Sequence, residues 1–161
     1  MIRTESTSRG SSLRRGIGLS APVIILLAAI AAIRVPLHEL GIVQDGSNLA
    51  GLLVFVPLAI WVAAALGRRV PNPLLALTVV GIAYGVMLAV IHQLFWGAVF
   101  GGGPPSLGGN LEGVLVPGVE AAIFRVSAFF SSLATGTMVG ALTGAVAWAI
   151  QRLRRTRRAT P

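Results

Sequence analysis

Four long apolar stretches constrain this chain more than any other feature of its sequence. They occupy residues 17–34, 49–66, 74–96 and 121–150, and polar or glycine-rich connections separate them. A helix rises 1.5 Å per residue, so about 20 apolar residues are enough to cross a hydrocarbon core of about 30 Å. The pattern therefore predicts an all-α integral membrane protein with four transmembrane helices in an antiparallel bundle.

The composition supports this interpretation and excludes an ordinary water-soluble globule. Charged residues make up only 11% of the chain, against about 25% in an average soluble domain. The chain has no cysteine, which excludes disulfides, thiol nucleophiles, cysteine-bound zinc and iron–sulfur clusters. We expect a membrane domain at residues 16–150, preceded by a disordered basic leader at 1–15 and followed by a basic tail at 151–161.

The charged residues are sorted along the chain. Eleven of the thirteen arginines lie in the leader, in the connection after the second stretch and in the tail, whereas Glu39, Asp45, Glu112 and Glu120 lie in the other two connections. The positive-inside rule then predicts that both termini are cytoplasmic. We expect the cell membrane of a bacterium as the location, with the lipid bilayer and anionic lipids at the arginine-rich tail as partners, and no nucleic acid.

Small residues recur at helical spacing in the third and fourth stretches. Residues spaced four apart share one face of a helix, and small ones let two backbones approach closely. The pattern predicts tight packing within one bundle; the alternative is a self-association face on the fourth helix. The predicted packing residues are Gly81, Gly85, Ser132, Gly136, Gly140 and Gly144.

Ionisable residues also gather near the predicted outer edge of the membrane. Interfacial anchoring explains them, although His38 and His92 could together ligate a metal or a haem. We expect Arg125 to pair with Glu39, Glu112 or Glu120, or to reach the lipid headgroups. The predicted outer cluster consists of Arg34, His38, Glu39, His92, Glu120 and Arg125.

The sequence contains no recognisable catalytic motif. No ionisable residue stands at mid-membrane depth in the four stretches, which argues against proton-coupled pumps and voltage sensors. We therefore predict a non-enzymatic membrane protein without a cofactor, acting as an accessory or structural subunit through helix packing. The alternative is an oligomeric pore or small-solute permease, suggested by the hydroxyls of Ser127, Ser131 and Thr135 and by the glycine-rich connection at 97–119. A metal- or haem-dependent membrane enzyme is a third hypothesis.

Overall fold

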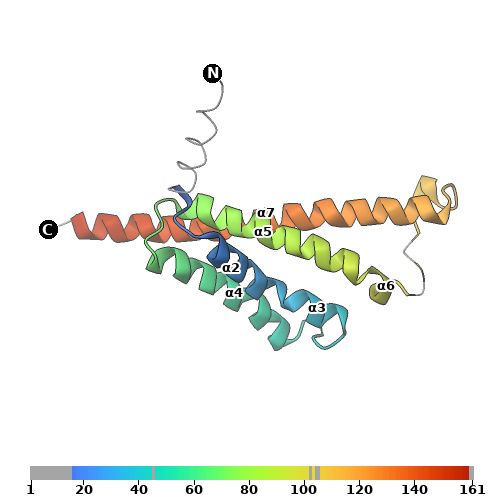
Figure 1. Ribbon diagram of the computed structural model, residues 1–161, viewed down its shortest axis with the longest axis horizontal. Coiled ribbons are helices and arrows are strands. Elements are labelled where there is room, and N and C mark those ends of the chain that lie inside the picture. Colours follow the sequence, from blue (N-terminus) through green and yellow to red (C-terminus); the bar gives the residue numbers. More distant parts are fainter. Residues whose placement is uncertain (1–15, 45, 102, 104–105, 160–161) are drawn as a thin grey trace, which may run out of the picture.

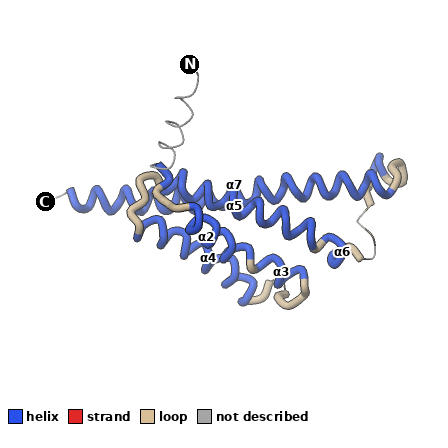
Figure 2. The backbone as a smooth tube through the Cα atoms, in the orientation of Figure 1, coloured by secondary structure: helices blue, strands red, loops and turns tan. Residues whose placement is uncertain are grey.

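The computed structural model describes residues 16–44, 46–101, 103 and 106–159. Within these residues every regular element is helical, as Figure 2 shows, and four helices are long and apolar enough to cross a membrane. This confirms the prediction of an all-helical chain with four candidate spans. The leader at 1–15, Asp45 and the last two residues of the tail lie outside the described residues.

The four candidate spans lie close to the predicted stretches. The first combines two helices that meet at Ile33, and a short helix and a 3-10 turn precede the fourth. In chain order the elements are α2 (Ala21–Ala32), α3 (Arg34–Glu39), α4 (Asn48–Gly67), α5 (Pro73–Leu94), α6 (Trp96–Val99), η1 (Gly109–Leu111) and α7 (Pro117–Ala159).

Local signals account for where the helices begin. Ser47 and Asn72 cap α4 and α5, and each side-chain oxygen accepts a backbone N–H from three residues further on, at 3.1 Å. Such caps satisfy donors that the first helical turn leaves unpaired. The first span begins at residue 21 rather than 17 because Gly18 has a φ of +64°. That left-handed conformation interrupts a right-handed helix.

Helix α7 is longer than the span predicted at 121–150. It has 43 residues, which corresponds to a length of about 65 Å, whereas a bilayer with its headgroups measures about 40–45 Å. The helix begins at Pro117 and continues without a break through the arginines of the tail to Ala159. Figure 1 shows α7 extending beyond the other helices in both directions. The described part of the tail is therefore an extension of the fourth span.

Helices α5 and α7 run antiparallel and make the most extensive contact between described helices. A Cβ atom placed on Gly81 would lie 2.6 Å from the Gly140 Cα, and one placed on Gly136 would collide with the Gly85 backbone. A Cβ atom on Gly144 would lie 2.9 Å from the Leu74 Cα at the start of α5. The glycine face of α7 is thus covered by α5, which is the close approach that a small-residue face allows.

A buried tryptophan joins the remaining helices to this pair. Trp61 of α4 is fully buried, and its indole Nε1–H donates a hydrogen bond of 2.8 Å to the Leu27 carbonyl of α2. Its ring also meets Tyr84 of α5 edge to face, with the ring centroids 5.9 Å apart. Leu77 and Val80 of α5 complete the core around it.

The two ends of the bundle differ in charge. The acidic end contains α3, α6 and the start of α7, and its described carboxylates are Glu39, Glu112 and Glu120. The arginine-rich end contains the α4–α5 connection, with Arg68 and Arg69, and the last part of α7.

Candidate functional site

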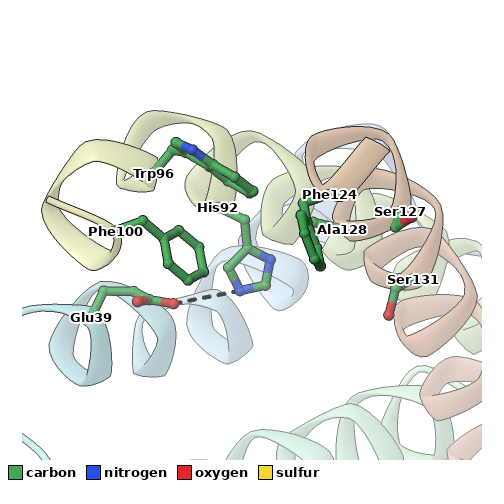
Figure 3. Close-up of a pocket in the computed structure, with 8 residues that line it drawn as sticks. All are labelled: Glu39, His92, Trp96, Phe100, Phe124, Ser127, Ala128 and Ser131. Atoms are coloured by element: carbon green, nitrogen blue, oxygen red, sulfur yellow. Dashed lines mark ion pairs between the residues drawn. The ribbon is translucent and has the colours of Figure 1, made fainter. Parts of the chain in front are cut away.

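A cavity of about 460 Å³ lies at the acidic end, between α3, α5, α6 and α7. Figure 3 shows Glu39 and His92 facing each other, with Trp96 and Phe100 on the α6 side and Phe124 on the α7 side. We call it the Glu39 cavity. It is lined by Glu39, His92, Trp96, Phe100, Phe124, Ser127, Ala128 and Ser131.

His92 connects three elements within this site. Its Nε2 lies 3.6 Å from a carboxylate oxygen of Glu39 on α3, and its Nδ1 lies 3.0 Å from the Ser132 hydroxyl on α7. The Ser132 hydroxyl in turn donates a hydrogen bond of 2.7 Å to the Ala128 carbonyl. With that proton committed, the hydroxyl accepts from Nδ1–H, so His92 carries a proton on Nδ1.

This network differs from a hydrolytic triad despite its Ser, His and Glu members. A serine nucleophile donates its proton to the histidine, whereas the Ser132 hydroxyl donates to a backbone carbonyl one turn earlier. Ser132 is also only 4% exposed and does not line the cavity. The contact therefore orients the imidazole ring and leaves its Nε2 edge directed at Glu39.

No protein-family model, curated protein or solved structure matches this chain.

Arg125 has different partners from those that the sequence suggested. Its guanidinium donates to the Gln93 side-chain oxygen at 3.1 Å, and the Gln93 amide donates back to the Arg125 carbonyl at 3.0 Å. The guanidinium also lies 4.7 Å from the ring centroid of Trp96. Among the described residues no carboxylate forms an ion pair with it. The prediction of a glutamate partner was wrong because Gln93 of α5 and Trp96 of α6 stand opposite Arg125. The alternative, contact with lipid headgroups, stays a prediction.

The other members of the predicted outer cluster do not converge on the cavity. Glu120 accepts a 3.3 Å hydrogen bond from the Leu107 backbone N–H and so holds the connection before α7. Arg34 and His38 belong to α3, but neither lines the Glu39 cavity. Within the described residues no group of three potential ligands could hold a metal ion. Of the six cluster residues, only Glu39 and His92 line the cavity together.

Several residues of the site were missed by sequence reasoning. Phe100 and Phe124 lie in a glycine-rich connection and in an apolar stretch, where nothing distinguishes them from lipid-facing side chains. Ser132 was assigned to helix packing alone, although its hydroxyl also holds His92. Gln93 could have been predicted to take part in the site, because an amide beside a histidine at the end of a span needs hydrogen-bond partners.

Proposed function

We propose that this chain is a non-enzymatic four-span protein of the bacterial cell membrane, with both termini in the cytoplasm. It acts as an accessory membrane component by binding a ligand in the Glu39 cavity. The ligand is an amphiphile that carries an ammonium group. The observation that carries this proposal is a carboxylate set among three aromatic rings in one cavity.

The chemistry of the lining favours a cation. Aromatic rings attract ammonium groups through their negative faces, and a carboxylate adds a full opposite charge. Trp96 already takes part in one such contact, with Arg125. The Glu39 side chain is 14% exposed, so an ammonium group that reached it would leave most of its water behind. A partly dehydrated ion pair of this kind is stronger than one in bulk water.

An apolar groove beside the cavity supports an amphiphile rather than a small polar cation. The groove has a volume of about 390 Å³ and runs along the first turns of α7. Ser127 lines both the groove and the Glu39 cavity. A ligand whose charged head occupies the cavity therefore has an adjacent apolar surface for its hydrocarbon part.

A pore or permease in a single chain gains no support from the described residues. The Glu39 cavity lies at one end of the bundle, and a second polar cavity, beside Arg69, lies at the other. The core between them contains Trp61, Leu77 and Val80, all fully buried. Among the described residues these apolar side chains leave no polar path from one cavity to the other.

Binding of benzyltrimethylammonium to detergent-purified protein tests the proposal. We expect saturable binding by isothermal titration calorimetry, and none of comparable strength for the uncharged carbon isostere neopentylbenzene. Glu39→Gln keeps the size of the side chain but removes its charge, so we expect affinity to fall by about tenfold, as loss of a charged partner does in a partly buried site.

Glu120→Gln is the matched control, because it removes a carboxylate from the same end without touching the cavity lining. We expect this variant to bind within about twofold of the parent protein. Equal binding of the uncharged isostere, or equal losses in the two variants, would contradict a cation site at Glu39.

A further inference from the structure

The arginine-rich end holds a polar cavity of its own. It measures about 200 Å³ and lies between the end of α4 and the last part of α7. Gln151 ties these elements together, because its side-chain amide donates a hydrogen bond of 3.1 Å to the Val70 carbonyl in the α4–α5 connection. The cavity is lined by Leu66, Arg69, Gln151, Arg154 and Arg155.

The three guanidinium groups of this cavity have no polar partner among the residues that the structure describes. Within the part of the chain that the structure describes, the side chains of Arg69, Arg154 and Arg155 form no hydrogen bond or ion pair. The three described glutamates all belong to the acidic end. Three cations that line one small cavity repel each other, so an anion between them lowers the energy of the arrangement.

The position of this cavity relative to the membrane interface indicates which anion can reach it. One turn of α7 before the cavity, Trp148 lies under the Arg152 guanidinium, 4.6 Å from ring centroid to cation. Tryptophan with a neighbouring arginine is typical of the interface between hydrocarbon and headgroups. Leu153 follows on the same helix and is 63% exposed, which suits contact with acyl chains. The cavity at the arginine-rich end, called the arginine cavity from here on, thus lies at the level of lipid phosphates.

We propose that this cavity binds the phosphate of an anionic glycerophospholipid headgroup. The guanidinium groups present parallel N–H donors that match phosphate oxygens, and the Gln151 amide holds the cavity in shape. The site depends on insertion of the chain in a membrane, but it is independent of the proposed ammonium site at the other end.

The backbone at Arg69 adds a means of testing the site. Its φ is 51°, in the left-handed region that residues other than glycine rarely adopt. Glycine is the usual residue at such a position after a helix. An arginine here therefore costs stability, whereas its side chain contributes to the cavity. Arg69→Gly should raise the unfolding temperature and weaken lipid binding at the same time.

Native mass spectrometry in a neutral detergent, with short-chain phosphatidylglycerol as the probe, measures the affinity. We expect each arginine removed from the cavity to weaken binding by about fivefold. The triple variant Arg69→Gln, Arg154→Gln and Arg155→Gln should therefore lose about 100-fold in affinity. Phosphatidylcholine, which has the same phosphate but no net charge, should bind more weakly than phosphatidylglycerol to the parent protein.

A second triple variant provides the control for net charge. Arg68→Gln, Arg152→Gln and Arg157→Gln remove the same charge from the same end without altering the cavity lining. We expect this variant to stay within about threefold of the parent. Equal losses in both triples would overturn the site in favour of diffuse attraction, as would an unchanged affinity in the cavity triple.

Inorganic phosphate and glycerol phosphate distinguish a lipid from a free anion. If either displaces phosphatidylglycerol at an equal concentration, the ligand is soluble phosphate and the lipid assignment fails. If the glutamine triple does not fold, the Arg69→Gly variant decides. A higher unfolding temperature with weaker lipid binding supports the site, and a higher temperature with unchanged binding contradicts it.

Discussion

Trp61 fills the core with its ring and also donates a hydrogen bond to a neighbouring helix. Its ring is fully buried among α2, α4 and α5, and its N–H reaches the Leu27 carbonyl at 2.8 Å. Trp61→Phe keeps most of the ring but removes the donor. We expect this variant to lose about 1 kcal/mol of unfolding free energy, a typical value for one hydrogen bond between helices. Reversible unfolding of the detergent-purified protein measures the loss.

Trp148→Phe is the matched control at the residue scale. Trp148 is 42% exposed, and its contact is with Arg152 rather than with a backbone carbonyl. Phenylalanine also offers a ring face to a cation, so we expect little change in stability. A loss equal to that of Trp61→Phe would mean that ring volume, and not the hydrogen bond, explains the effect.

At the scale of elements, we expect opposite effects of alanine at two glycines, one inside the α5–α7 contact and one outside it. A Cβ at Gly81 would meet the backbone of Gly140 at 2.6 Å, and the backbone cannot move aside as a flexible side chain can. Gly51 lies within α4, and apart from its own helix turn no described heavy atom lies within 4 Å of such a Cβ. We expect Gly81→Ala to destabilise the protein by about 1–3 kcal/mol through overpacking.

Gly51→Ala should instead leave the stability unchanged or raise it by about 0.5–1 kcal/mol, because alanine restricts the unfolded chain and favours a helix. The sign of the change is measured by unfolding in the same detergent. Destabilisation of similar size in both variants would contradict the interlocked packing of α5 against α7.

The elements also explain how far the sequence could predict the site. Hydrophobic length and small-residue spacing are properties of a single segment. The candidate spans and the small residues of the α5–α7 contact could therefore be predicted from the sequence. The contact of His92 with Ser132 joins residues 40 positions apart. It depends on the register of two helices, which no local pattern specifies. Glu39 meets His92 because α3 carries the first span beyond its predicted end at residue 34.

At the scale of the whole molecule, the separation of charge leads to a proposed orientation. The arginine-rich end holds most of the described arginines, and the acidic end holds the described glutamates. Segments rich in arginine stay on the cytoplasmic side when a membrane protein is inserted. The arginine-rich end should therefore face the cytoplasm. The arginine cavity would then contact anionic lipids of the inner leaflet, and the Glu39 cavity would open toward the outside.

The absence of cysteine makes this orientation directly testable, since one introduced thiol is the only reactive site. Ser106→Cys places it in the connection before α7, at the acidic end, and Thr156→Cys places it near the end of α7. In intact cells a membrane-impermeant maleimide should label only the first variant, and after permeabilisation it should label both. Labelling of Thr156→Cys alone in intact cells would reverse the orientation. It would then turn the Glu39 cavity toward the cytoplasm and the arginine cavity toward the outer leaflet, while the interlocked α5–α7 pair remained the same.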